Sequence, residues 1–217
     1  MTDFIKWITQ ACLRIKSEEP SLIIYTDPFG IENEEEADLI LITHDHYDHL
    51  SGENIKKVLG TNTQIVVPLV CKEKIMEVIE DENKITFIEV GQSYEVKGIA
   101  IRAVPAYNVV KTKYHPKKKK YVGYVITVNG KKVYIAGDTE EIPEMEDINS
   151  DISILPLGQT YTMNSVNEAV SATIKTGCSI AIPYHFGTYE GNMEDAKKYK
   201  KLLEKKGITV NILQSEK

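Results

Sequence analysis

Cysteine is scarce in this chain of 217 residues, and the few cysteines present are widely separated. They are Cys12, Cys71 and Cys178, and no two of them form a C-x-x-C pair. An odd number at such spacings argues against a disulfide framework and against a zinc site built from thiolates. Each cysteine stands in an apolar or helical stretch, so we expect small buried side chains at these positions.

Long apolar runs are also missing, and the net charge is modest. No stretch approaches the roughly 20 apolar residues of a membrane-spanning helix, so we predict no membrane partner. Residues 1–14 mix polar and charged side chains among the apolar ones and hold no unbroken signal-peptide core, which favours a cytoplasmic location. The net charge of −6 disfavours a general nucleic-acid partner. The sequence leaves open whether the chain forms a homo-oligomer.

Several common catalytic signatures do not occur. The chain has no G-x-S-x-G elbow, no G-x-G-x-x-G after a strand and no P-loop. Its hydrophobic fraction of 42% and charged fraction of 27% are ordinary for a globular protein with a sizeable core. No repeat and no linker rich in Gly, Ser or Pro divides it, so we predict a single domain over residues 1–217.

Short segments rich in β-branched residues and bounded by turn residues predict strands. These segments are 22–26, 39–42, 64–67, 85–90, 99–104, 122–128, 132–136, 152–155, 179–182 and 209–213. Between two of them, Asn129-Gly130 is typical of a two-residue hairpin.

Helices are predicted between and after these strands. Ser165 and Glu168 predict a capping box at the start of one helix, and Asn192 predicts the cap of another. Further helices are expected over residues 69–78 and from near Gly52. Strand-rich halves with flanking helices favour two packed sheets with helices outside, a mixed α/β (α+β) arrangement.

The residues best suited to chemistry follow the apolar strand 39–42. The segment Thr43-His44-Asp45-His46-Tyr47-Asp48-His49 holds three of the chain's five histidines. His44 and His46 are two residues apart, so in an extended loop they project to the same side, while Asp48 and His49 can turn toward a second position. Imidazole and carboxylate ligands suit zinc, iron, manganese or nickel. The pattern therefore predicts a metal site.

This segment resembles the His-x-His-x-Asp-His signature of the metallo-β-lactamase superfamily. The resemblance extends over nearly the whole chain through three more segments in the family's order. These are 24–29 with Asp27-Pro28, 134–139 with Asp138, and 182–188 with His185. The resemblance implies an αββα sandwich whose metal ligands stand on loops at one edge of the sheets.

The resemblance also implies a two-metal centre. Its implied ligands are His44 and His46 for the first metal, Asp48, His49 and His185 for the second, and Asp138 as the bridge between them. Metals about 3.5–4 Å apart can share one hydroxide and clamp a substrate oxygen. Asp48 and Asp138 would then act in catalysis, whereas Asp27 is expected to orient His49 or its neighbours.

The sequence departs from the family pattern at one position. Family members usually supply a third histidine to the first metal after a mid-chain strand, but Asn108 stands at the expected place and His115 follows it. An amide oxygen is a poorer zinc ligand than an imidazole, so three alternatives remain. The first site is weak, His115 swings in, or Asn108 coordinates through its amide oxygen. The wider match resembles a bacterial and archaeal branch of metal-dependent hydrolases that lies near enzymes opening phosphorylated sugar lactones.

Two other features bear on the substrate. Lys111, Lys113 and residues 117–120 surround His115 and form either a solvated loop or a basic lip that attracts an anionic substrate. Tyr161 either lines the mouth of the site or packs as an ordinary tyrosine.

Together these features predict a metal-dependent hydrolase, in which a metal-bound hydroxide attacks a small, anionic ester, lactone or phosphodiester. The expected cofactor is one or two divalent ions, with zinc favoured and manganese, iron or nickel as alternatives. The competing hypothesis is a catalytically weakened module on the same scaffold that binds a metal or a ligand without turnover.

Overall fold

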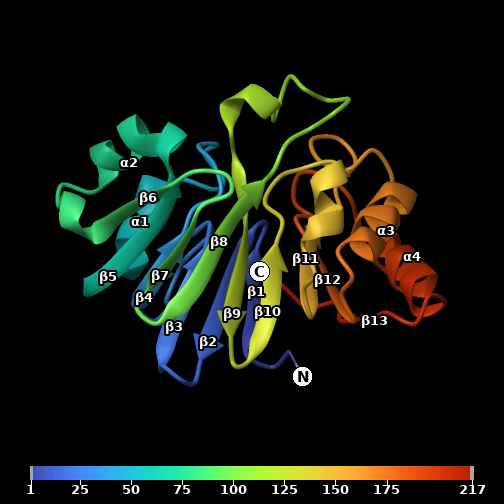
Figure 1. The fold of residues 1–217 in the computed structure, drawn as a ribbon, viewed down its shortest axis with the longest axis horizontal. Coiled ribbons are helices and arrows are strands. Elements are labelled where there is room, and N and C mark those ends of the chain that lie inside the picture. The colour runs from blue at the N-terminus through green and yellow to red at the C-terminus, as the bar shows by residue number, and fades with distance from the viewer. Residues whose placement is uncertain (1, 216–217) are drawn as a thin grey trace.

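Two β-sheets face each other in the computed structural model, which describes residues 2–215 (Figure 1). The first sheet has six strands in chain order: β1 (Ile5–Thr9), β2 (Cys12–Ser17), β3 (Leu22–Thr26), β4 (Ala37–Leu41), β5 (Leu59–Pro68) and β6 (Ile85–Ile88). The second has seven: β7 (Ser93–Val96), β8 (Ile99–Pro105), β9 (Val122–Val128), β10 (Lys131–Ile135), β11 (Ile152–Pro156), β12 (Ile180–Tyr184) and β13 (Thr209–Val210).

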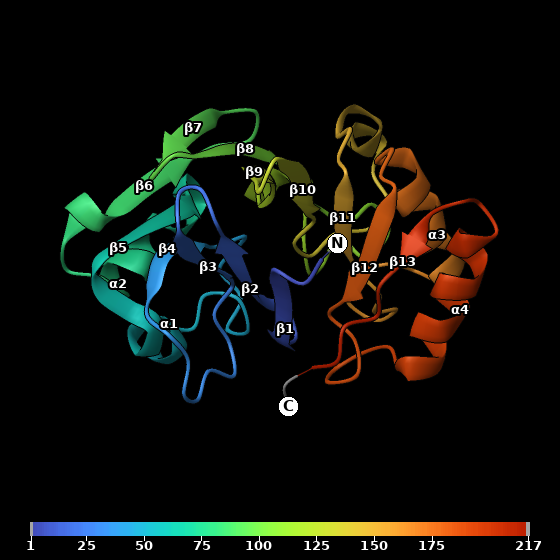
Figure 2. The same cartoon turned by 90° about the horizontal axis from the view of Figure 1, so that it is seen from below.

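Each sheet begins with antiparallel strands and continues with parallel ones. Strands β3 to β6 and strands β10 to β13 pair in parallel. Parallel neighbours need crossover connections, and most of these carry a helix. The helices are α1 (Gly52–Val58), α2 (Lys72–Val78), α3 (Val166–Lys175) and α4 (Met193–Glu204). Figure 2 shows α1 and α2 outside the first sheet and α3 and α4 outside the second. The predicted αββα sandwich is thus confirmed.

The core has two parts that match these layers. The larger cluster lies between the sheets, where it includes the fully buried Leu39, Tyr124 and Ile154, and it continues to the buried residues of α3 and α4. The smaller cluster lies between the first sheet and its helices, and includes Ile40 and Ile55. Leu39 and Ile40 are adjacent on β4 and so point to opposite faces, which explains the unbroken apolar run that leads to the histidine-rich loop.

Every predicted strand overlaps an observed one, and 22–26 and 122–128 match residue for residue. The predicted strand 209–213 shortens to Thr209–Val210. Strands β1, β2 and β7 were not predicted. Both faces of β1 and β2 are largely buried, which hides the alternation, and β7 is a short, exposed edge strand.

The turn and cap predictions mostly hold. Asn129 and Gly130 both take positive φ, 50° and 69°, as a tight hairpin turn requires. Asn192 caps α4 in a full capping box. The box predicted at α3 is half formed, because Ser165 accepts from the Glu168 N–H while the Glu168 carboxylate accepts from the Asn164 N–H instead.

The helix predicted over residues 69–78 and the buried cysteines are also observed. Residues 69–78 begin as a 3-10 turn, Leu69–Cys71, before α2. The three cysteines are buried, and none forms a disulfide. Within residues 2–215, no helix has the length and apolar character needed to span a bilayer.

Candidate metal centre

The site is built from loops that follow the carboxyl ends of strands. His44, His46, Asp48 and His49 follow β4, Asp138 follows β10, and His185 follows β12. Parallel strands of one sheet end at the same edge, so the loops after β10 and β12 meet there, and the packing of the two sheets places the loop after β4 beside them. Gly137 directs the chain at one of these ends. Its φ is 67°, and a Cβ there would lie 3.0 Å from the carbonyl oxygen of Val122.

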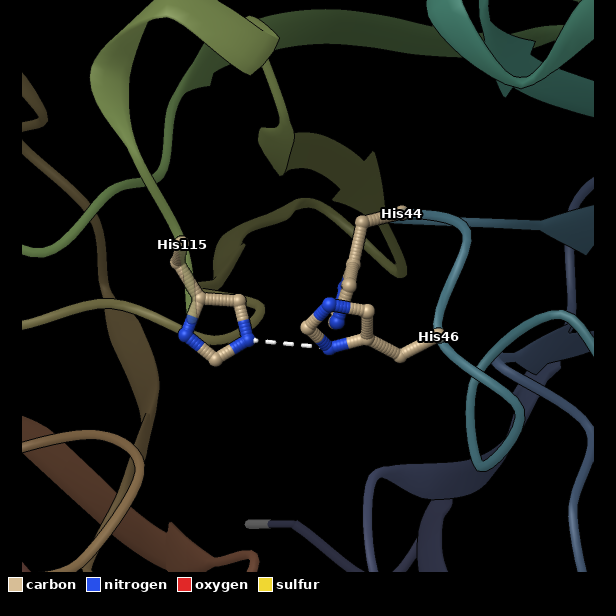
Figure 3. A group of neighbouring side chains, drawn as sticks. All are labelled: His44, His46 and His115. Carbon is tan, nitrogen blue, oxygen red and sulfur yellow. Dashed lines mark hydrogen bonds between the residues drawn. The ribbon is translucent and has the colours of Figure 1, made fainter. Parts of the chain in front are cut away.

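A three-histidine group consists of His44, His46 and His115, whose nearest nitrogens all lie within 4.8 Å of one another. His115 Nε2 is 3.2 Å from His46 Nδ1, and the rings of His44 and His46 cross at 4.5 Å between centroids. Figure 3 shows His115 approaching the other two imidazoles from a separate segment of the chain. Three nitrogens at this spacing can hold one metal ion.

A mixed group consists of Asp48, His49 and His185, also within 4.8 Å. Asp48 Oδ2 is 3.7 Å from His49 Nε2 and 3.9 Å from His185 Nε2. Asp138 lies between the two groups. Its Oδ1 is 3.2 Å from His185 Nε2, and its Oδ2 is 3.3 Å from His115 Nε2. The structure therefore brings together all six residues that the sequence selected as metal ligands, and adds His115.

Asn108 is not part of either group. Its Nδ2 donates to the carbonyl oxygens of Lys111 and Tyr161, at 3.2 and 2.7 Å. Its backbone N–H donates to the His115 carbonyl at 2.7 Å, and it pairs with Pro116 in an isolated bridge. The chain therefore loops out after Asn108 and returns beside it. Of the three alternatives, this geometry favours His115 as the third imidazole.

Glu140 fixes this loop and was not singled out from the sequence. Its buried carboxylate accepts the backbone N–H groups of Val109, Val110 and Lys111, at 2.7, 2.6 and 2.9 Å. Hydrogen bonds to an ionised acceptor are about twice as strong as neutral ones. The carboxylate thus determines the path by which the chain reaches His115.

Asp27 makes the contact expected of an orienting residue. Its Oδ2 is 2.7 Å from His49 Nδ1, and its two oxygens accept from the N–H and hydroxyl of Thr43 at 2.8 and 2.6 Å. With Nδ1 engaged by Asp27, Nε2 of His49 is the nitrogen that faces Asp138 and Asp48.

Glu190 orients the His185 ring as Asp27 orients His49, although nothing in the sequence pattern marked Glu190. Its Oε1 is 3.0 Å from His185 Nδ1, and its Oε2 accepts the backbone N–H groups of Thr160 and Tyr161. Burial raises the pKa of Glu190, but the contact with His185 outweighs this effect and the net pKa is lowered. The charged carboxylate therefore leaves His185 Nε2 as the atom that faces the mixed group.

Unpaired polar atoms at the centre test whether these residues fit a metal. Among the described residues, His44 Nε2, His49 Nε2 and Asp138 Oδ1 are buried without a hydrogen-bond partner. Leaving a buried donor or acceptor unpaired costs about 1–3 kcal/mol, so such atoms are rare. A divalent ion accepts lone pairs from all three, and the residues present therefore fit one.

Comparisons with known proteins agree with this geometry. Residues 4–185 match the model of the beta-lactamase superfamily domain. A UPF0173 metal-dependent hydrolase of Thermoplasma acidophilum is 33% identical, over 98% of this chain and 96% of the relative. The chain belongs to this family. Another member, from Thermococcus onnurineus, is 31% identical over 98% of this chain and 97% of its own length.

Solved structures share the fold of this chain. A proposed metal-dependent hydrolase from Parabacteroides distasonis has a TM-score of 0.84 and 34% identity, covering 97% of this chain and 93% of its own. The metallo hydrolase Igni18 from Ignicoccus hospitalis has a TM-score of 0.79 at 20% identity, covering 98% and 95%. The resemblance predicted from the sequence is confirmed, and the chain is a family member with a histidine and carboxylate cluster that can bind a metal.

Protonation distinguishes the two groups of this family member. Burial lowers the pKa of His44 well below its usual value, and burial with the nearby His115 lowers that of His46 to about 4. Burial acts in the same direction on His49 and His185, but carboxylates outweigh it. Asp138 and Asp27 raise the pKa of His49 well above its usual value, and Asp138 with Glu190 raises that of His185.

We therefore expect the metal affinity of the mixed group to depend more steeply on pH than that of the three-histidine group. In metal-free protein His49 and His185 retain protons that an ion must displace, so affinity falls as pH drops below their raised pKa values. His44 and His46 carry no proton near neutral pH, because burial lowers both pKa values, that of His46 to about 4. Each displaced proton changes affinity about tenfold per pH unit. Competition titrations with a chromophoric chelator measure both affinities, and equal slopes for the two sites would contradict this expectation.

A cavity of about 380 Å³ opens above the two groups. Its lining includes Tyr47, Tyr114, Tyr161 and Tyr189 together with Lys74. Tyr47 and Tyr189 form one edge-to-face pair, with ring centroids 6.1 Å apart, and Tyr114 and Tyr161 form another at 5.0 Å. Tyr161 therefore lies at the mouth of the site, one of the two positions that the sequence left open.

The lysines around His115 do not line this cavity. Lys117 is 2.9 Å from Glu144, Lys120 is 3.9 Å from Glu89, and the Lys111 ammonium donates to the carbonyl oxygens of Gln159 and Met163. These contacts favour the solvated loop over the basic lip. Lys74 is the one lysine or arginine among the described lining residues, and its ammonium donates to the Asp45 carbonyl at 2.6 Å.

Proposed function

We propose that this protein hydrolyses a small, anionic ester, lactone or phosphodiester at a centre of two divalent ions. One observation carries the proposal: His44 Nε2, His49 Nε2 and Asp138 Oδ1 are buried without hydrogen-bond partners and lie close together beneath a cavity of small-molecule size. Bound divalent ions would lower the pKa of a water molecule and polarise the carbonyl or phosphoryl oxygen of the substrate.

The chain's own residues would bind the ions and orient the ligand rings. The three-histidine group would bind one ion, the mixed group the other, and Asp138 would contact both. Asp27 and Glu190 fix the rings of His49 and His185 through their Nδ1 atoms, at 2.7 and 3.0 Å, so each ring keeps its Nε2 directed to the centre. Such outer partners typically account for a 10- to 100-fold difference in metal affinity or activity.

The ligand types support zinc for the first ion. Three imidazoles with an open position are a common catalytic zinc set. The mixed group adds carboxylate oxygens, which also suit manganese or iron. We therefore propose zinc at the three-histidine group and leave the second ion as zinc, manganese or iron.

The cavity walls support a compact, ring-sized substrate with a negative charge. Tyrosines in the lining offer aromatic faces and hydroxyl groups. Lys74, whose ammonium is 3.5 Å from the Asp45 carboxylate, supplies a positive charge at the rim, where its side chain is 54% exposed. The cavity volume is at the small end of the range for ligand pockets.

Elemental analysis of gently purified protein, paired with a hydrolysis screen, tests the proposal. The screen compares lactones, phosphodiesters and thioesters with the wild-type chain and with His46→Ala as a metal-ligand control. We expect two ions per chain and turnover of at least one anionic compound, both reduced in the control variant. Two bound ions without turnover of any compound would instead favour a module that binds without catalysis.

Lys74→Met tests the charge of the substrate. We expect KM for the anionic substrate to rise about fivefold, with kcat unchanged, since an exposed charge contributes up to about 1 kcal/mol. Added salt should remove the difference between variant and wild type, because exposed charges are screened over about 10 Å at ~0.1 M.

Lys120→Met provides the matched control for Lys74→Met. The Lys120 side chain is 70% exposed and lies outside the cavity lining. Equal KM changes in the two variants would count against a role of Lys74 in binding the substrate.

A further inference from the structure

Gln10 stands in the turn between β1 and β2 and is held from two sides. Its carbonyl oxygen accepts from Trp7 Nε1 at 2.8 Å and from the His185 backbone N–H at 3.0 Å. Its φ is 49°, in the left-handed region that costs a non-glycine residue about 1–2 kcal/mol. Such a conformation persists only where the surroundings fix it, so the side chain is aimed in a set direction.

The Gln10 side chain points into the mixed group of Asp48, His49 and His185. The Gln10 residue is 1% exposed, and its Nε2 lies 3.1 Å from Asp48 Oδ2 and 2.8 Å from His185 Nε2. Its Oε1 is buried and has no hydrogen-bond partner among the described residues. The amide is therefore wedged between two of the residues that would bind the second ion, with its oxygen unused.

We propose that the amide oxygen of Gln10 is a further ligand of the ion held by Asp48, His49 and His185. This rests on the proposed function, in which the mixed group binds a divalent ion. His185 Nδ1 is engaged by Glu190 at 3.0 Å, so Nε2 is the nitrogen left for the ion. The Gln10 amide is beside that nitrogen and so beside the place of the ion.

A half-turn of the Gln10 amide would change it from a hydrogen-bond donor into a metal ligand. Nε2 and Oε1 are nearly equal in size, so rotation about the Cγ–Cδ bond exchanges them with little change in packing. In the metal-free protein the NH₂ group donates to the Asp48 carboxylate and, where His185 Nε2 carries no proton, to the lone pair of that nitrogen. With a cation present, those lone pairs are taken up by the ion, and the amide is better placed with its oxygen inward. Side-chain amide oxygens are ordinary ligands of divalent ions.

This assignment makes the two metal positions chemically different. The three-histidine group offers three nitrogens, whereas the mixed group with Gln10 offers two nitrogens, the Asp48 and amide oxygens, and Asp138 as a shared contact. Oxygen-rich sets favour manganese relative to nitrogen-only sets. The second ion should therefore exchange for Mn²⁺ more readily than the first.

Metal titration of the full, metal-free chain with Mn²⁺ or Co²⁺ alone tests the assignment without relying on activity. Gln10→Met keeps the side-chain length and removes the oxygen, and we expect it to weaken the second ion about 10- to 100-fold. The first ion serves as the internal control and should bind as in the wild type. Gln10→Glu keeps an oxygen and should bind the second ion at least as tightly as the wild type. The cobalt(II) absorption of the second ion should change in Gln10→Met and not in Gln10→Glu.

The outcomes separate this inference from the proposed function. If Gln10→Met binds the second ion with wild-type affinity and an unchanged cobalt spectrum, Gln10 is not a ligand, while the two-ion function stands. If the wild type binds no second ion, both are overturned. Should Gln10→Met fail to fold by circular dichroism, Gln10→Asn takes its place, because its shorter side chain keeps the amide but does not reach the ion.

Discussion

His115→Ala should lose the ion of the three-histidine group, and its kcat should fall about a thousandfold or more. A catalytic ion supplies several kcal/mol of transition-state stabilisation, and each 1.4 kcal/mol corresponds to about tenfold in rate. His115 is 1% exposed, with Nε2 at 3.2 Å from His46 and 3.3 Å from Asp138, so alanine removes a nitrogen from the centre itself. Elemental analysis after gel filtration, together with kcat on the substrate found by screening, measures both effects.

Asn108→Ala is the matched control, because Asn108 stands where the sequence pattern placed the missing histidine. Its amide bonds only backbone carbonyls of Lys111 and Tyr161, so alanine should lower the free energy of unfolding by about 1–3 kcal/mol and leave both ions bound. The reverse result, with the ion lost from Asn108→Ala and kept by His115→Ala, would show that the amide coordinates.

The part of the site that the sequence predicted is the part governed by strand ends. His44 to His49 are neighbours in sequence, and Asp138 and His185 each follow an apolar strand. The resemblance to the metallo-β-lactamase superfamily selected Asp138 and His185. The loops after β10 and β12 meet because parallel strands of one sheet end at the same edge, and the packing of the two sheets brings the β4 loop beside them. The fold was predicted from the alternation of short apolar strands with helices in each half of the chain.

The choice between Asn108 and His115 depends on a loop path that no local pattern encodes. That path is fixed by Glu140, which is about 30 residues away in sequence from the N–H groups that it accepts. Glu140 and Glu190 are acidic residues in loops, and a sequence gives no sign that such a residue is buried. Their role becomes visible only from their burial, 1% and 6% exposed, and from their partners.

Strand β2 and the role of the turn at Gln10 were not predicted, because each contains a buried polar residue. Arg14 lies on β2 and is 8% exposed, which breaks the expected alternation, yet Glu34 pairs with its guanidinium at 2.7 Å. Gln10 is a single amide between two strands and resembles any turn residue. Buried polar groups are retained where a partner satisfies them, and the partner is distant in sequence in both cases.

Asp138→Asn should remove both ions and lower kcat by roughly 10⁴-fold or more, the largest effect expected at this site. Among the described residues, Asp138 is the one carboxylate in contact with both groups. Its Oδ1 is 3.4 Å from His49 and 3.2 Å from His185, and its Oδ2 is 3.3 Å from His115. Asparagine keeps the shape but turns one oxygen into an NH₂ group, which donates rather than accepts and cannot face a cation.

A second readout of Asp138→Asn needs no metal. The Asp138 charge is the first of the attractions that raise the pKa of His49 in the metal-free protein. The carboxylate stabilises the protonated ring, so removing its charge should lower that pKa, and nuclear magnetic resonance of the histidine ring protons follows the titration. Asp45→Asn is the control, since Asp45 belongs to the loop of His46 and His49 but accepts a hydrogen bond from the Tyr121 hydroxyl and lies outside both groups. Asp45→Asn should keep both ions and leave the pKa of His49 unchanged. If Asp45→Asn lost as much metal as Asp138→Asn, general disturbance of the site, and not loss of the bridging carboxylate, would explain the effect.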